Sequence, residues 1–275
     1  STQGVTLFPY TTLFRSARDA APDKKAALWR RVIRIASASA PDENRVLRAR
    51  EQLLTLEPEN LEVVRELVPV YRQRESWSRL STMLEILLAH ETEAGSPARR
   101  ELFESLWRLH EEKLKDPRAA FQWCGRAFGE FPGPDVEQEL VRLAEATDAW
   151  ESLVVIGREV AAGLEDATYQ LSLHLTLGGI CKDRLGWRDE GIDYFSRVLA
   201  EEPENRRALD ALEQLYAQTK RWPELLAVLG RRIPLAESDE ERIRIGFRVA
   251  EINEEFLSEP RAALEALTDI LDLDP

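Results

Sequence analysis

Three histidines and two cysteines are the side chains of this 275-residue chain best suited to catalysis or metal binding. No His-x-x-x-His, Glu-x-x-His or Cys/His pairing that would place ligands on one helix face accompanies His90, His110 or His174. Cys124 and Cys181 have no second Cys or His at a metal-ligand spacing, and they cannot form a disulfide framework. We therefore interpret the histidines as helix-surface or interface residues, Cys124 as a buried core residue, and Cys181 as a partly accessible thiol without an activating partner.

The other polar patterns predict no catalytic site either. Glu111 and Glu112 are adjacent acids, and such runs are typical of solvated helix surfaces. Gly178 and Gly179 adjoin, but no glycine-rich loop with phosphate-binding spacing joins a strand to a helix, and we expect no strands. The sequence therefore predicts a protein that is not an enzyme and that holds neither a metal nor a cofactor.

Prolines and tryptophans recur along the chain at a nearly constant period. The prolines are 74, 71 and 72 residues apart, and a tryptophan follows each of the first three by 18 or 19 positions. They are Pro58, Pro132, Pro203 and Pro275, with Trp77, Trp150 and Trp222. Such self-similarity is typical of stacked supersecondary units, each of which buries its apolar face against the next. The chain is therefore predicted to be a repeat array.

Each period divides into two helical hairpins, and in the first type the tryptophan marks the turn. Apolar residues three and four apart give each helix one apolar stripe. The matched positions are Leu67, Tyr71, Trp77, Leu80 and Leu84, then Leu212, Tyr216, Trp222, Leu225 and Leu229, and more loosely Leu140, Ala144, Trp150, Leu153 and Gly157. Pro223 suits the first turn of a helix, so the second helix is predicted to begin at Trp222.

The second type of hairpin has four copies of one apolar pattern. The matched positions are Leu28, Val32, Ile35 and Ala40, then Leu102, Leu106, Leu109 and Leu114, then Leu173, Leu177, Ile180 and Leu185, and Ile245, Val249, Ile252 and Leu257. Ser96 before Pro97, and Ser238 with Glu241 at capping-box spacing, predict two helix starts. Small residues where two helices must approach closely are Ala120, Gly191 and Ala263, and Asn60 and Asn205 are placed in the turns between hairpins.

These motifs resemble the tetratricopeptide repeat family. That family places a small residue twelve positions before a terminal proline, a large apolar residue eight before it and a small residue five before it. The two sets that fit are Ala120, Cys124, Ala127 and Pro132, and Gly191, Phe195, Val198 and Pro203. The resemblance covers residues 20–275. It departs from the family pattern because the units alternate between two lengths and the first-helix glycine is mostly absent, Gly179 being the nearest match.

The resemblance implies an all-α fold, a right-handed superhelical solenoid of about seven helical hairpins whose first helices line a concave face. We expect the hairpins at residues 22–58, 60–90, 96–132, 135–162, 167–203, 205–234 and 238–275. Residues 1–16 are expected to be a non-native or disordered leader. The stretch from Thr6 to Ser16 has no helical period and looks like a translated sequencing adapter.

The composition argues against two classes of partner. The chain carries 50 acidic and 37 basic residues, a net charge of -13, which disfavours binding to nucleic acid. No stretch approaches the roughly 18 apolar residues of a membrane span. Because two cysteines suggest a reducing compartment, we expect a cytoplasmic location. Export stays open, since the sequence begins at Ser1 and its only methionine is Met83.

The predicted function is that of a non-catalytic scaffold binding a protein or peptide segment along the concave groove. The family's inward first-helix positions correspond to Arg65, Arg72, Gln73, Gln138, Arg142, Asp210, Gln214 and Gln218, each of which could equally be solvated surface. Arg65, Arg72 and Arg142 would form a basic strip for an acidic partner segment. Most of the tryptophans are predicted to pack inside the array, and Trp29 and Trp107 either pack there or face a partner. The alternative is a regulatory or sensor segment of a larger enzyme or signalling protein whose catalytic domain lies outside this sequence.

Overall fold

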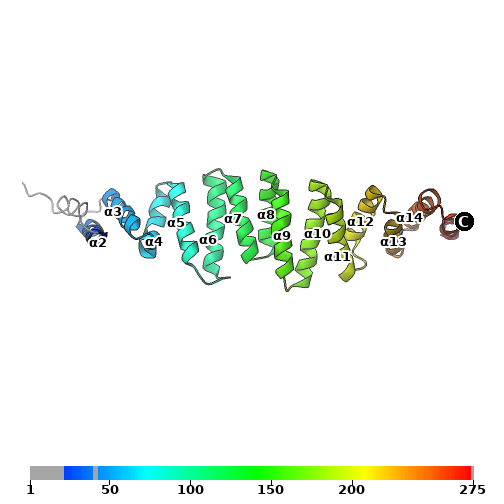
Figure 1. Cartoon of the computed structure of the whole chain (residues 1–275), viewed down its shortest axis with the longest axis horizontal. Coiled ribbons are helices and arrows are strands. Elements are labelled where there is room, and N and C mark those ends of the chain that lie inside the picture. The colour runs from blue at the N-terminus through cyan, green and yellow to red at the C-terminus, as the bar shows by residue number, and fades with distance from the viewer. Residues whose placement is uncertain (1–21, 40–42, 274–275) are drawn as a thin grey trace, which may run out of the picture. The chain divides into compact units, whose positions relative to one another are not determined.

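A computed structural model describes residues 22–39 and 43–273 of the chain (Figure 1). The leader predicted at residues 1–16 lies outside this part. Every regular element in the described ranges is a helix, and they contain no strand. The helices divide into two compact units, one reaching Leu143 and the other starting at Ala144. The prediction of an all-α helical repeat is therefore confirmed.

The N-terminal unit is built from three helical hairpins and most of a further helix. Its elements are α2 (Pro22–Ser39), α3 (Glu43–Leu56), α4 (Leu61–Gln73), α5 (Trp77–His90), α6 (Pro97–Arg108), a π-helical turn (Leu109–Lys113), α7 (Pro117–Glu130) and α8 (Pro134–Thr147), whose last residues belong to the other unit. Helix α2 packs on α3, α4 on α5, and α6 on α7, and α5 also packs on α6. Each hairpin thus contacts its neighbour in the sequence.

The C-terminal unit repeats this plan. Its elements are α9 (Trp150–Gly163), α10 (Ala167–Ile180), a π-helical turn (Cys181–Leu185), α11 (Arg188–Glu201), α12 (Arg206–Thr219), α13 (Trp222–Arg232), a 3-10 turn (Ile233–Leu235), α14 (Asp239–Glu251), a π-helical turn (Ile252–Phe256) and α15 (Pro260–Leu273). Helix α10 packs on both α9 and α11, and α12 packs on α11 and α13. Leu209, Leu212 and Leu215 of α12 lie in the core cluster that joins α11 to α12 and α13.

The two hairpin lengths arise from two ways of ending the first helix. In the first type a residue with positive φ, Glu75, Asp148 or Lys220, follows the helix, and the next N–H donates to the carbonyl five residues back. In the second type a π-helical turn precedes the positive-φ residue, and the corresponding bond reaches six residues back. The positive-φ residues of that type are Lys115, Gly186 and Ser258. The hydrogen-bonded turn that ends the first helix therefore contains one residue more in the second type of hairpin than in the first.

Local capping sets the helix starts. Ser96 Oγ accepts the N–H of Arg99 at the start of α6, and Ser238 Oγ accepts the N–H of Glu241 at the start of α14, as predicted. Asn60 and Asn205 lie in the turns between hairpins and also cap: their side chains accept hydrogen bonds from the first turns of α4 and α12. Helices α5, α9 and α13 begin at Trp77, Trp150 and Trp222, which confirms the predicted start of α13.

Small residues allow α10 and α11 to approach closely. A Cβ on Gly191 would lie 3.6 Å from the Gly178 carbonyl oxygen, and a Cβ on Gly178 would lie 3.0 Å from the Phe195 ring. Gly179 was the nearest match to the first-helix glycine of the family pattern, but a Cβ on Gly179 would meet no atom within 4 Å. The adjacent glycine, Gly178, is the one that packing requires.

Aromatic and thiol side chains fill the interior of both units. Trp29 and Trp107 are buried, so they pack within the array and do not face a partner. Cys124 is buried, as predicted. The prediction for Cys181 was wrong, because this thiol is fully buried where the π-helical turn packs against α9 and α11.

Candidate partner-binding site

Helix α4 carries three of the predicted binding residues. Val63, Val64, Leu67 and Tyr71 are buried on one side of the helix, which leaves Arg65, Arg72 and Gln73 exposed. Within the described residues these three side chains make no hydrogen bond or ion pair. Arg65 and Arg72 are two helical turns apart, so their Cα atoms stack along the same side at a spacing of about 10 Å. The α4 surface therefore offers two cations that the fold does not use.

Helix α8 carries Gln138 and Arg142, both exposed. Arg142 is already paired: Nη2 lies 2.6 Å from Glu139 Oε1 and 2.6 Å from Glu111 Oε2. The arginine holds the pKa of Glu139 below its ordinary value, mainly by hydrogen bonding to the carboxylate. Because two carboxylates surround this guanidinium, Arg142 contributes less free positive charge than Arg65 or Arg72.

The predicted residues of α12 connect this helix to its neighbours. Asp210 pairs with Arg232 of α13 at 3.1 Å. Gln214 Oε1 accepts a hydrogen bond from Lys182 at 2.9 Å, and Gln218 Oε1 accepts one from Arg188 at 3.3 Å. All three side chains are nevertheless exposed, so they form a polar surface whose positions are fixed by contacts to α13, to α11 and to the π-helical turn after α10.

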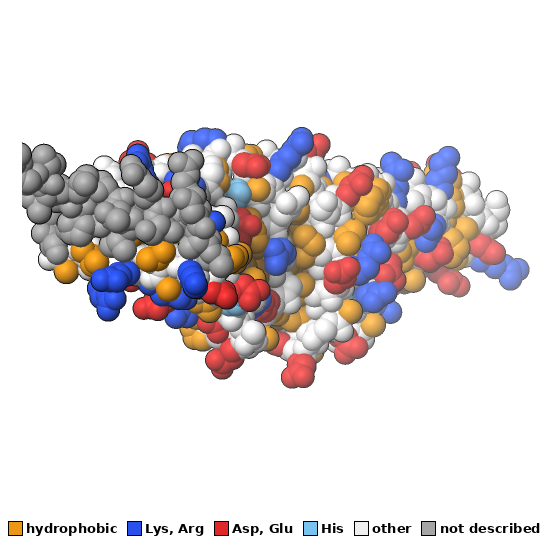
Figure 2. Space-filling view, turned by 60° about the vertical axis from the view of Figure 1, so that its left-hand side comes forward, with side chains coloured by type: hydrophobic (Ala, Val, Ile, Leu, Met, Phe, Trp, Pro, Cys, Tyr) orange, Lys and Arg blue, Asp and Glu red, His pale blue; other side chains and the backbone are white. Residues whose placement is uncertain are grey.

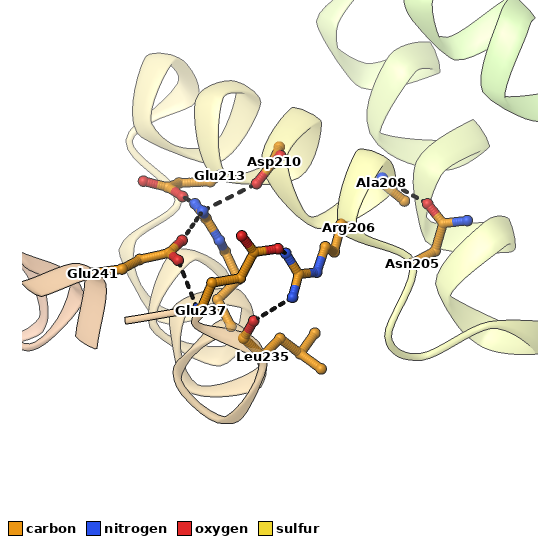
Figure 3. A network of polar contacts seen from close by, with 9 residues as sticks. Asn205, Arg206, Ala208, Asp210, Glu213, Leu235, Glu237 and Glu241 are labelled. Atoms are coloured by element: carbon orange, nitrogen blue, oxygen red, sulfur yellow. Dashed lines mark hydrogen bonds and ion pairs between the residues drawn. The ribbon is translucent and has the colours of Figure 1, made fainter. Parts of the chain in front are cut away.

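Arg232 lies at the centre of a carboxylate network that joins α12, α13 and α14. Figure 3 shows the acidic members of this network, Asp210, Glu213 and Glu241. Its guanidinium pairs with Asp210, with Glu213 and, at 3.5 Å, with Glu241. Glu241 Oε2 also accepts the backbone N–H of Glu237 at 3.0 Å, and this hydrogen bond is the main reason that the pKa of Glu241 is lowered. The network holds three consecutive helices in one arrangement.

A hollow of about 680 Å³ lies beside this network. Leu229 and Ile245, both buried, contribute apolar walls, and Glu213 and Arg232 contribute the polar wall shared with the network. The residues that line the rest include Arg244, Phe247 and Arg248 of α14. The side chain of Phe247 is 54% exposed, which is unusual for a phenylalanine in a helix that already packs on two neighbours. The α12–α14 hollow thus combines an exposed aromatic ring with two arginines.

The sequence analysis did not single out Phe247, Arg244 or Arg248. Phe247 lies between the core residues Ile245 and Val249 of the α14 stripe, where the helical period calls for a polar side chain. An aromatic residue outside the apolar stripe was the available signal. The arginines carried no such signal, because charged residues are ordinary on the outer face of a helix.

One histidine lies in a hydrogen-bonded chain with a serine and a carboxylate. Ser81 Oγ lies 2.9 Å from His110 Nε2 and donates to Glu85 Oε1 at 2.8 Å. A nucleophilic serine would need the histidine between the serine and the acid, whereas here the buried serine is in the middle. His110 Nδ1 has no partner in the described part of the chain. The arrangement therefore links α5 to the π-helical turn after α6 and does not activate Ser81.

The buried thiols are not poised for reaction. Burial raises the pKa of Cys124 to about 12 and that of Cys181 to about 11, so both remain protonated at neutral pH. Among the described residues no cluster of three or more His, Cys, Asp or Glu side chains could hold a metal ion.

Solved structures with a similar fold are repeat proteins. No family model matches the sequence, and neither does any curated protein. The chain is similar to tetratricopeptide repeat proteins. A tetratricopeptide repeat protein from Parabacteroides merdae is 12% identical, with 97% of this chain and 93% of that chain covered and a TM-score of 0.31. MamA 41-end from Desulfovibrio magneticus RS-1 is 13% identical, with 64% and 94% covered and a TM-score of 0.39. The TPR2AB domain of yeast Sti1, from a complex with pHSP90, is 11% identical, with 88% and 99% covered and a TM-score of 0.27.

The helical hairpins present a surface of mixed charge. Figure 2 shows acidic and basic side chains interspersed on one face of the described chain, with smaller apolar areas between them. Each helix in the described ranges is too short or too polar to traverse a lipid bilayer.

Proposed function

We propose that the chain is a non-catalytic scaffold that binds a segment of a partner protein on the exposed faces of its first helices. The α12–α14 hollow carries this proposal. An exposed phenylalanine loses the stabilisation that burial would provide, about 1.5–3 kcal/mol for a large apolar side chain, and a bound partner would restore it. The hollow is also large enough to receive one or two side chains of a partner segment.

The chemistry of the α12–α14 hollow favours a segment that carries an apolar residue beside acidic ones. Phe247 and Leu229 offer apolar contact, whereas Arg244 and Arg248 offer guanidinium groups that can hold carboxylates bidentately. Arg248 lies 3.0 Å from Glu251, an exposed pair one helical turn apart that a partner carboxylate can replace at little cost. Arg232 is surrounded by three carboxylates, so we assign it to the rigid wall of the hollow.

The sequence-predicted residues extend this surface. Asp210, Gln214 and Gln218 on α12 would contact the backbone of the bound segment through their amide and carboxylate groups. In the N-terminal unit, Arg65 and Arg72 of α4, with Gln73, would form a separate basic contact, and Gln138 and Arg142 of α8 would add polar groups. Association through several such local contacts is how a repeat array holds an extended partner.

The test is selection of displayed peptides on the intact chain, followed by affinity measurement on variants. Phe247→Ala and Arg244→Glu should weaken the selected peptides by about tenfold or more, because each removes a central contact of the hollow. Val155→Ala is the matched control, since Val155 is an exposed apolar residue on α9 outside the hollow. Arg65→Glu with Arg72→Glu tests the α4 surface in the same way. Equal affinity for all variants and the parent chain would show that the proposal is wrong.

A further inference from the structure

Hairpins α6/α7 and α10/α11 differ at one pair of rings. In hairpin α6/α7 the equivalent pair is Phe103 and Trp123, with ring centroids 6.3 Å apart. A shift of 71 residues places His174 and Tyr194 at these positions, with centroids 5.7 Å apart. An apolar aromatic pair has thus been replaced by a polar one at the same place in the hairpin.

The environment of the two pairs also differs. In α6/α7, Arg126 lies over both rings, 4.4 Å from the Trp123 centroid and 5.9 Å from that of Phe103. Its counterpart, Arg197, donates from Nε to Asp193 at 2.9 Å. This leaves both Nη groups of Arg197 without a hydrogen bond to the described residues. The arginine at this repeat position therefore stacks on two rings in α6/α7, as Arg126, whereas in α10/α11, as Arg197, it lines a hollow.

Packing does not explain His174. Its side chain is 8% exposed, and Nδ1 is buried without a partner in the described chain. Burial lowers the pKa of the imidazole, which keeps the ring neutral at neutral pH. An unsatisfied buried polar atom destabilises the fold, and the phenylalanine used in α6/α7 would avoid that cost. The His174 ring therefore leaves one nitrogen that the described residues do not use.

His174 lines a hollow of about 560 Å³ between α9, α10 and α11. Arg158 lies on its α9 side and makes a single hydrogen bond among the described residues, from Nε to Tyr194 Oη at 3.4 Å. Its terminal nitrogens are unused. On the α11 side, Asp193 is paired with Arg197, whereas Glu190 makes no ion pair within the described residues. The hollow thus has an unused cation on one wall and an unused acid on the other.

The charges of the lining side chains balance. Asp189 also lines the hollow but pairs outward with Arg221 at 2.5 Å. The remaining groups are the cations Arg158 and Arg197 and the acids Glu190 and Asp193. All four of these side chains are exposed, and a molecule with both a carboxylate and an ammonium group is the ligand that would match the acids and the cations together.

We propose that this hollow binds a free α-amino acid. Arg158 and Arg197 take the carboxylate, Glu190 takes the ammonium group, and His174 and Tyr194 supply hydrogen bonds at the buried end. The volume lies within the range of small-molecule sites, and a free amino acid carries both charged groups within that space. The site shares no residue with the α12–α14 hollow, so it is independent of the scaffold function proposed above.

The test follows the ring signals of the histidines by NMR while L-glutamine is titrated into the intact chain. The chain has only three histidines, so a His174→Phe variant assigns the His174 signal and the other two serve as internal controls. The His174 signal should shift saturably, and His90 and His110 should not. Arg158→Gln and Glu190→Gln should each weaken binding by about tenfold or more. Arg126→Gln, the matched change in hairpin α6/α7, should leave binding unchanged.

Glutamine derivatives that lack one of the two charged groups test the proposed contacts to the ammonium group and to the carboxylate separately. N-acetyl-glutamine lacks the ammonium group and glutaminamide lacks the carboxylate, so each should bind about tenfold or more weakly than glutamine. If N-acetyl-glutamine or inorganic phosphate shifts the His174 signal as strongly as glutamine does, the site is an anion site and the proposal is wrong. Absence of any saturable shift with a panel of free amino acids would also overturn it.

A double variant tests whether His174 and Tyr194 are required for packing of the hairpin. His174→Phe with Tyr194→Trp installs the ring pair found in α6/α7, and it should abolish binding without lowering the unfolding midpoint in urea. A marked fall in that midpoint would show that His174 and Tyr194 are required for packing, which would remove the reason to assign them to a ligand.

Discussion

Two glycines in the C-terminal unit test the turn geometry that distinguishes the hairpin types. Gly186 follows a π-helical turn with φ 67° and ψ 18°, a left-handed conformation, whereas Gly179 lies within α10. A Cβ at either position would meet no atom within 4 Å. Steric crowding therefore contributes nothing, and the same glycine-to-alanine change at the two positions differs only in backbone conformation.

The two substitutions should have opposite signs. A left-handed conformation costs an L-residue about 1–2 kcal/mol, partly offset by about 0.4–1 kcal/mol from the reduced freedom of the unfolded chain. Gly186→Ala should therefore destabilise by about 1 kcal/mol. Within a helix alanine is favoured over glycine by about 0.8–1.0 kcal/mol, so Gly179→Ala should stabilise by a similar amount. The reciprocal change, Lys220→Gly at φ 57°, should stabilise the turn after α12 by about 0.5–1 kcal/mol.

The assay is urea unfolding followed by far-UV circular dichroism, combined with hydrogen exchange of α10 and α11. Exchange is needed because a repeat array can open one hairpin at a time, so a local change is diluted in a global signal. Gly178→Ala is an additional control, since its Cβ would lie 3.0 Å from the Phe195 ring and should destabilise by crowding. If Gly186→Ala and Gly179→Ala shifted stability in the same direction, the assignment of Gly186 to the turn geometry would be refuted.

Three further predictions concern burial and charge. Trp150 is buried beneath the guanidinium of Arg184, which lies 4.8 Å from the ring centroid. Trp150→Ala should therefore lower the free energy of unfolding, measured in urea, by roughly 3–5 kcal/mol. A loss under about 1 kcal/mol would contradict the role of Trp150 in the core. Cys124 and Cys181, with pKa values raised to about 12 and about 11 by burial, should resist iodoacetamide in the folded chain and react after unfolding; labelling of the folded chain would contradict this. The pKa of Glu130 is lowered mainly by its hydrogen bonds with Arg99, so the folded state gains stability above the ordinary pKa of glutamate and loses it as the pH falls through the lowered value. Glu130→Gln should therefore flatten the acid side of the stability profile, and an unchanged acid side would refute the assignment.

Local sequence was sufficient to predict the helical repeat. Ser96 and Ser238 cap helices through atoms three residues away, and Trp222 and Pro223 begin α13, because such contacts depend only on neighbours along the chain. The period between equivalent prolines then predicted that each hairpin packs on the next, since each repeats the same buried positions. What periodicity did not predict was the π-helical turn, because one inserted residue changes the hydrogen bonding without altering the apolar stripe.

The candidate sites depended on contacts between segments far apart in the sequence. The sequence placed Arg142 and Asp210 on exposed helix faces, but their partners, Glu111 and Arg232, lie 31 and 22 residues away and were brought together only by stacking. The same holds for Cys181, whose burial depends on α9 and α11, and for the hollow of His174, whose walls come from three helices. Helical periodicity determines which face of a helix is apolar. The tertiary structure decides which polar side chains on the other face meet a partner, because that depends on the distance and angle between hairpins, which single-helix patterns do not encode.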